Sequence, residues 1–301
     1  MAIVLGNHQY GKAENRVVRI YRDTARHEIR DVNVSTTLRG NFAEAHLYGD
    51  QSQVLPTDTQ KNTAFAFAKS EGIAAIESFG LALGRHFVDN TDPATGARIE
   101  IEEYSWQRAM VDGLEHDHTW VRSGQEIRTA AVTIEGTGDG QSAHVIAGFK
   151  DLVLLKSTGS EFQDFLTDRY TTLEETSDRV LATALVARWR YGTLDVDWDA
   201  VYASAKQIMV AQFATLHSLA LQQTLWHMGK AVLTAHPEIV EIQFCAPNKH
   251  HFLVDLEPFA LENPGEVFIA TDRPYGLIQA TITRDDATDA GTAWTSAAGL
   301  A

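Results

Sequence analysis

The sequence is poor in cysteine and has no long apolar run, and both shortages limit what the protein can be. Cys245 is the single cysteine among 301 residues, so an internal disulfide framework is excluded and a reducing compartment is favoured. No apolar stretch approaches the roughly 20 residues that a helix needs to cross a bilayer. The first ten residues hold only a short apolar run at 2–5 and no cleavage pattern, so no secretory signal is predicted.

Basic residues are scarce as well: 25 Lys and Arg stand against 40 Asp and Glu, which gives a formal net charge of -15. Phosphate contacts need clustered Lys and Arg, so no nucleic-acid partner is expected. An anionic substrate would need a local cationic pocket against this overall field. The sequence also lacks a Walker or dinucleotide type of glycine-rich loop, so a nucleotide cofactor is not predicted.

The most metal-like fragment of the chain is His116-Asp117-His118. It has no third ligand at a characteristic spacing. A solvated loop is therefore favoured over a zinc site, and no metal is predicted.

Apolar residues at every second position predict strands, and those at every third or fourth position predict helices, in an order that recurs along the chain. The first half predicts strands at 16–21 and 31–39, helices from 57–59 through 69 and at 73–88, and strands at 99–110 and 126–134. After a glycine-rich break at 136–140, the second half predicts strands at 144–155 and 185–196, helices at 199–215 and 219–235, and strands at 239–245, 252–256 and 267–283. We expect an α+β fold of two duplicated units, 1–138 and 139–301, with antiparallel sheets and paired helices on one face. Such sheets expose strand edges, which favours association with further copies of the chain.

A polar cluster, Pro247-Asn248-Lys249-His250-His251, runs into the alternating apolar residues Phe252, Val254 and Leu256. The pattern predicts a strand that carries the Asn248 amide and the His250 imidazole on one face at its start. Such a pair can hold a small polar molecule or move a proton. A solvated strand end is the commoner alternative.

Two cations allow a chemical and a structural interpretation. Lys12 follows Gly11, which is expected to let the backbone turn just before the first strand, and it is either a buried base or a solvated lysine. Arg179 presents a fork that fits a planar anion, or it forms an ion pair with Asp178 or Glu175.

Three uncharged side chains also allow more than one interpretation. Thr57, with Asp58 and Thr59, is expected to cap a helix, although its hydroxyl can also relay a proton. Gln222 offers a donor and an acceptor near the start of a long helix, where solvated Gln is common. Phe162 lies in a loop of small polar residues as a stacking platform or a core plug.

Seven stretches together resemble the urate oxidase (uricase) family, in the family's order and over nearly the whole chain. They are QYGK at 9–12, TDTQKNT at 57–63, LLKSTGSEF at 154–162, TTLEETSDR at 171–179, ALQQT at 220–224, PNKHHF at 247–252 and DRPYG at 272–276. The departures are small: His251 stands where an aromatic is common, and the side chain at Leu221 varies in the family.

This resemblance implies a tandem pair of tunnelling-fold units whose sheets assemble, in a homotetramer, into a barrel-like tunnel with active sites between subunits. It implies cofactor-free oxidation of urate by O2 and water to 5-hydroxyisourate and hydrogen peroxide, in purine catabolism. The ending Gly299-Leu300-Ala301 lacks a peroxisomal address, which favours a bacterial, cytoplasmic enzyme.

The resemblance also assigns roles by motif position. The implied proton relay is Lys12, Thr57 and His250, with Lys12 and Thr57 lent by the neighbouring subunit. The implied substrate contacts are stacking on Phe162, paired hydrogen bonds from Arg179 and Gln222, a backbone contact from Leu221, and contacts from Thr57 and Asp58. Asn248 is implied to hold O2 and then water above the ring.

Two alternatives stay open at this stage. A tunnelling-fold enzyme that acts on a pterin usually uses zinc, and it predicts a cluster of metal-binding histidines. A purine-binding or purely structural oligomer predicts urate binding without oxygen consumption. The base of the relay is also open, because Lys12, Thr57 and the substrate would titrate as a coupled set.

Overall fold

The computed structural model describes residues 1–295 and divides the chain into two compact units. The first unit comprises residues 1–148, 193–199 and the described residues from 288 onward, and the second comprises 149–192 and 200–287. The expectation based on residues 299–301 lies outside the described residues. Within 1–295, none of the helices combines the length and apolar character that a membrane span requires.

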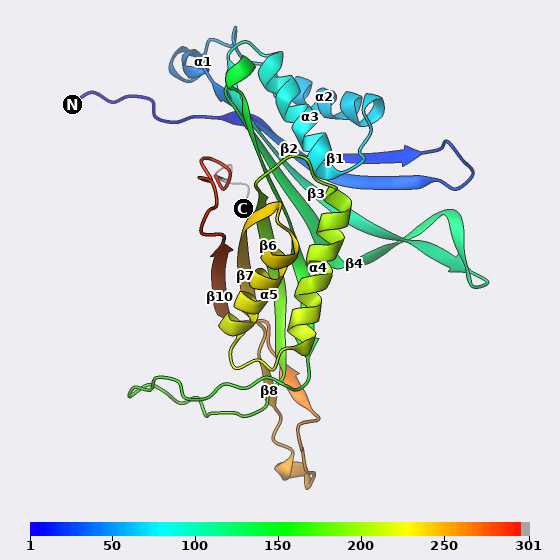
Figure 1. Ribbon diagram of the computed structural model, residues 1–301, viewed down its shortest axis with the longest axis vertical. Coiled ribbons are helices and arrows are strands. Elements are labelled where there is room, and N and C mark those ends of the chain that lie inside the picture. Colours follow the sequence, from blue (N-terminus) through cyan, green and yellow to red (C-terminus); the bar gives the residue numbers. More distant parts are fainter. Residues whose placement is uncertain (296–301) are drawn as a thin grey trace. The chain divides into compact units, whose positions relative to one another are not determined.

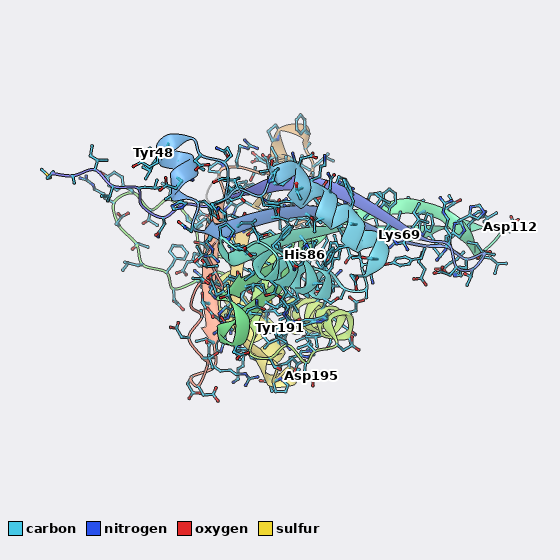
Figure 2. All side chains as sticks on the ribbon, turned by 90° about the horizontal axis from the view of Figure 1, so that it is seen from above. Tyr48, Lys69, His86, Asp112, Tyr191 and Asp195 are labelled. Carbon is cyan, nitrogen blue, oxygen red and sulfur yellow. The ribbon has the colours of Figure 1, made fainter. Side chains whose placement is uncertain are left out.

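The first unit is built on four antiparallel strands in the order β1-β2-β3-β4. Their bounds are β1 (Tyr10–Tyr21), β2 (Glu28–Gly40), β3 (Ala94–Val111) and β4 (Leu114–Glu135). Three helices connect β2 to β3: α1 (Ala43–Tyr48), α2 (Thr57–Ser70) and α3 (Ile76–Asp89). Figure 1 shows α2 and α3 side by side over these strands. The β3–β4 hairpin extends to a turn at Asp112, which Figure 2 labels at its tip.

Helix α3 packs unusually close to its sheet because it carries two glycines one turn apart. A Cβ atom on Gly80 would lie 2.8 Å from Val132 Cγ2, and one on Gly84 would lie 2.8 Å from Ile134 Cγ1. Those distances are below van der Waals contact, so no larger residue fits without displacing the helix. The apolar residues of this helix, among them Phe79, Leu83 and Phe87, are buried.

The second unit contains β6, β7, β10 and the part of β5 from residue 149 onward, in the strand order β5-β6-β7-β10, with β7 antiparallel to both β6 and β10. The bounds are β5 (Ser142–Lys156), which follows the short 3-10 turn η1 (Gly138–Gly140), β6 (Leu181–Tyr191), β7 (Ile239–Asn248) and β10 (Gly276–Thr283). Helices α4 (Trp198–Thr215) and α5 (Leu221–Ala235) follow β6, and α5 contacts β7 and β10. Here too a glycine permits close packing, since a Cβ on Gly229 would lie 3.0 Å from Ile282.

The expected mixture of α-helices with antiparallel strands is confirmed, but several predicted bounds are wrong. The strand predicted at 185–196 ends at Tyr191, because the Asp195 N–H donates to Thr193 Oγ1 (3.2 Å) in a turn. The strand predicted at 252–256 is only β8 (His251–Leu253), because the Asp255 carboxylate accepts the Glu257 N–H (3.0 Å) at η2 (Glu257–Phe259).

The interval predicted as strand at 267–283 holds two short strands rather than one long one. These are β9 (Phe268–Ala270), which pairs with β8, and β10. Pro274 lies between them and has no N–H to donate to a ladder. Helix α1 was not predicted, because none of its six residues is buried and an apolar stripe is therefore absent.

Candidate functional site

Six of the nine predicted site residues belong to the second unit, and the chain folds so that two of their segments are fixed to each other. Phe162 and Thr176 exchange backbone hydrogen bonds of 2.9 and 3.0 Å, and the Arg179 N–H donates to Ser160 O (2.7 Å). The segments 160–162 and 176–179 are thereby held in register. This register places the Phe162 ring and the Arg179 guanidinium next to each other.

A third segment, which leads into α5, holds the other side of the Phe162 segment. The Ser218 N–H donates to Gly159 O (2.9 Å), and the Glu161 N–H donates to Ser218 O (2.8 Å). The buried Ser218 hydroxyl also bonds the Thr224 hydroxyl in the first turn of α5 at 2.8 Å. Ser218 therefore ties the loop to the helix start. The sequence predicts no role for Ser218 or Thr224, because neither the serine nor the threonine follows an apolar period there, although Thr224 ends the ALQQT stretch at 220–224.

The Arg179 guanidinium lies over the Phe162 ring and forms no ion pair within residues 1–295. Its Cζ atom is 5.2 Å from the Phe162 ring centroid, and its Nε is buried without a hydrogen-bond partner in the described structure. Desolvation by burial lowers the pKa of Arg179. A half-buried cation whose Nε has no partner is costly, so it indicates a place for an anionic ligand.

The alternative ion pairs of Arg179 are not formed. The Asp178 carboxylate accepts instead from Thr158 and Gly159, and Glu175 Oε1 accepts the Asp164 N–H at 2.9 Å. Both acids are thus engaged elsewhere.

Phe162 is half-buried and already stacked on one side. The Phe165 ring lies parallel to it, with centroids 5.0 Å apart and an interplanar angle of 15°. One face of the Phe162 ring is therefore covered by Phe165. The interpretation of Phe162 as a core plug is wrong, because its ring is not among the fully buried side chains.

His250 lies close enough to Arg179 to feel its charge. Burial lowers the pKa of His250, and the positive charge of Arg179 lowers it further. The imidazole is therefore neutral at pH 7 and can accept a proton. Its backbone carbonyl accepts the Thr271 N–H (2.9 Å), which fixes the residue.

The expectation that Asn248 and His250 share one face at the start of a strand is wrong. Asn248 is the last residue of β7, paired with Thr183 on β6 and Gly276 on β10, and His250 lies between β7 and β8. The Lys249 N–H donates to Ala182 O (2.8 Å), which continues the pairing past the strand end.

Leu221 and Gln222 are the first two residues of α5. The preceding Ala220 is extended and provides no side-chain cap. The Leu221 side chain is buried and Gln222 is exposed. The uncapped N-terminus leaves backbone N–H groups and the positive end of the helix dipole available to an acceptor.

The other three predicted residues, Lys12, Thr57 and Asp58, form a group within the first unit. Lys12 on β1 pairs with Thr36 on β2. The Asp58 carboxylate in the first turn of α2 is bonded by Lys61 and, at 3.1 Å, by Asn62. The hydrogen bond and charge of Lys61 lower the pKa of Asp58, and the charge of Lys12 contributes to the same shift.

Two local expectations about this group are wrong. Lys12 lies inside β1, and Gly11 serves close packing of two strands rather than a turn, because a Cβ there would be 1.7 Å from Thr36 O. Thr57 does not cap α2. The helix begins at Thr57 after Pro56, and its N-terminus has no side-chain hydrogen bond.

In the fold, the fragment His116-Asp117-His118 lies near a further histidine, His27, but the described residues there are not arranged to hold a metal ion. The His116 and His118 rings are 4.5 Å apart, and the His27 ring is 5.9 Å from His118. Within residues 1–295, no three His, Cys, Asp or Glu side chains are grouped so that they could hold a metal ion.

Known proteins of one family match this chain over almost its full length. The family model described as Uricase matches residues 8–133 and 145–279. A uricase from Arthrobacter globiformis is 52% identical over 298 residues, which cover 99% of this chain and 96% of that protein. A uricase from Dictyostelium discoideum is 36% identical over 94% of this chain and 98% of its own. The crystal structure of the Arthrobacter globiformis uricase matches with a TM-score of 0.93 over 98% of this chain and 100% of that one. The chain therefore belongs to the uricase family.

Proposed function

We propose that this protein oxidises urate with O2 and water to 5-hydroxyisourate and hydrogen peroxide, as a step of purine catabolism in the cytoplasm, without a metal or organic cofactor. The observation that carries the proposal is the half-buried guanidinium of Arg179, whose Nε is buried without a hydrogen-bond partner, beside an aromatic ring and a neutral imidazole. Membership of the uricase family supports it independently.

Urate is a planar anion, and the second unit offers matching contacts for each of its parts. The purine stacks on the Phe162 face that Phe165 leaves open. Arg179 and Gln222 hold its edge through paired hydrogen bonds, of which the charged ones are the stronger. The backbone at Leu221, at the positive end of α5, adds a donor. The ligand thereby supplies the counterion that Arg179 lacks.

Proton removal prepares urate to give up electrons directly. The relay of Lys12, Thr57 and His250 takes a further proton from the bound anion, and the electron-rich ring then transfers two electrons to O2, which leaves as H2O2 after taking up two protons. Water held at Asn248 adds its hydroxyl to the ring to give 5-hydroxyisourate. Thr57 and Asp58 also contact the substrate. Orientation, a base and a protected O2 position are what the protein contributes.

The proposed assembly is a homotetramer of tandem tunnelling-fold units, 1–138 and 139–301, around a central channel. Lys12, Thr57 and Asp58 then reach the substrate from a neighbouring copy. Two features support association: the outermost strands β1 and β10 each have a single neighbouring strand within the described residues, and Asp58 lies exposed on the surface of its unit. Open strand edges favour pairing with another copy.

The test follows urate absorbance, oxygen uptake and peroxide release in protein that has been treated with a chelator, with molar mass measured by light scattering. We expect full turnover after chelation and the mass of four chains. Urate binding without oxygen uptake would instead identify a binding protein. Activity that appears only with stoichiometric zinc would favour the pterin-type alternative.

A further inference from the structure

Asp178 precedes the proposed urate-binding arginine, yet both of its carboxylate oxygens are directed to the segment that carries Phe162. Oδ2 accepts the Thr158 hydroxyl at 2.7 Å, and Oδ1 accepts the Gly159 N–H at 2.8 Å. The Thr158 hydrogen bond lowers the pKa of Asp178 most, and the backbone N–H of Gly159 adds to the shift. The side chain is therefore an ionised acceptor at neutral pH.

These side-chain bonds continue the backbone pairing described above. The Arg179 N–H binds Ser160 O (2.7 Å), one residue beyond the bond from Gly159 to Asp178. The Asp178 carbonyl in turn accepts the Thr176 hydroxyl at 2.7 Å. Side chain and backbone of Asp178 thus join residues 158–160 to residues 176–179, only two residues before Phe162.

The same bonds determine what Asp178 does not do. Each oxygen is directed to residues 158–159, and the carboxylate forms no ion pair with the neighbouring Arg179, whose lowered pKa has burial as its cause. If the carboxylate turned toward the guanidinium, it would neutralise the charge that the substrate is proposed to meet.

We propose that Asp178 is a positioning residue for urate binding: it holds the Phe162 segment against the Arg179 segment and, with both oxygens directed there, leaves the guanidinium to the substrate. The inference rests on the proposed function. It assigns Asp178 no part in proton transfer. Its loss is therefore expected to weaken binding and to leave the chemistry of bound urate nearly intact.

The experiment compares Asp178→Ala with Asp178→Asn in the full chain. Alanine removes two hydrogen bonds, so KM and the anaerobic Kd for urate rise about tenfold while kcat stays within roughly threefold of the parent. Asparagine restores both constants to near parent values, because its carbonyl accepts the Gly159 N–H and its amide donates to Thr158 Oγ1. Without O2 the bound urate is not consumed, so Kd is measured directly by titration.

The matched control is Asp168→Ala, which removes the same charge from an exposed turn. Asp168 Oδ1 accepts the Tyr170 N–H at 2.9 Å, a contact of the same kind that involves neither Phe162 nor Arg179. We expect its KM and Kd to equal those of the parent. If Asp178→Ala does not fold, Thr158→Val removes one of the two bonds and should raise KM by a smaller factor.

Three results would overturn the inference while urate oxidation itself stands. They are an unchanged KM in Asp178→Ala, a loss of kcat at unchanged Kd, or an Asp178→Asn variant as weak as the alanine variant. A weak Asp178→Asn variant would show that the negative charge of Asp178, rather than its hydrogen bonds, produces the effect. That charge also raises the pKa of Lys156, which burial lowers. A parent that neither binds nor oxidises urate would remove the proposed function and this inference together, and that result is read before any variant is made.

Discussion

The two units hold their candidate residues in opposite electrostatic states. In the second unit, Arg179 is partly desolvated, and no acid among the described residues pairs with it. In the first unit, Asp58 is exposed and lies among the cations Lys61 and Lys12, whose charges lower its pKa. A group that binds an anion must be left unpaired, because the ligand brings the second charge. A group that passes protons benefits from neighbours of both signs, because the charge that moves is compensated at each position.

This contrast also resolves the apparent conflict between a formal net charge of -15 and an anionic substrate. The overall field opposes urate, but a single guanidinium in partly desolvated surroundings attracts an anion far more strongly than an exposed one does. The cation that matters is local and is not visible in the composition.

Removing Lys12 tests the proton-transfer role assigned to the first unit, and we expect it to have the largest effect of all the variants. In Lys12→Met, kcat should fall on the order of 10³-fold, because loss of a general base typically costs 10² to 10⁴. The anaerobic Kd for urate should stay within a factor of about three of the parent, because Lys12 is not one of the proposed substrate contacts and the stacking and charged contacts, Phe162 and Arg179, lie on the second unit. Stopped-flow absorbance and anaerobic titration separate the two quantities.

Lys69→Met is the control for that variant, since Lys69 is an exposed lysine at the far end of α2 (Figure 2). It should leave kcat unchanged. If Lys12→Met weakened binding as much as turnover, the division into a relay side and a binding side would be wrong.

Much of the fold was predictable because its elements are long and regularly patterned. The buried stripe of Phe79, Leu83 and Phe87 identifies α3 directly. What could not be predicted follows from contacts distant in sequence. Gly11 was interpreted as a turn, whereas its close approach to Thr36 on the neighbouring strand is visible only after β1 and β2 are paired.

The candidate site divides in the same way. The types and positions of its residues followed from motif resemblance, but the state of each side chain did not. From the sequence alone, Arg179 could either bind a ligand or form an ion pair with Asp178. The hydrogen bonds of Asp178 with Thr158 and Gly159 become visible only in the folded structure. The lowered pKa of His250 likewise depends on burial and on an arginine 71 positions earlier in the chain.

Removing Arg179 tests the second unit's side and has the next largest effect. Arg179→Ala should raise the anaerobic Kd for urate about 100-fold, because two charge-assisted hydrogen bonds are lost. Arg179→Lys should recover little of this, since a point charge does not replace a planar fork. Thermal stability should be equal or slightly higher, because an unpaired desolvated charge has been removed.

Arg169→Ala is the matched control, because the Arg169 guanidinium also lies over an aromatic ring, 4.5 Å from the centroid of the exposed Tyr170. It should bind urate like the parent. Equal affinity in Arg179→Ala and the parent would contradict the anion-binding role and the contrast drawn from it.

The smallest effect concerns pH, and it couples His250 to the unpaired arginine. The folded pKa of His250 is lowered below its ordinary value near 6.5 by burial and by Arg179. The unfolded chain therefore binds this proton more readily. The contribution of His250 to stability is fully present above pH 6.5 and is lost as the pH falls through the folded pKa.

Activity that depends on the neutral imidazole of His250 should decline over the same acidic range. In Arg179→Ala the like charge is gone, so the pKa of His250 should rise toward its ordinary value without reaching it, because burial, the larger cause of the lowering, remains. NMR titration of the His250 ring protons in parent and variant measures this shift without requiring turnover, and an identical pKa in both proteins would show that the imidazole does not sense the guanidinium.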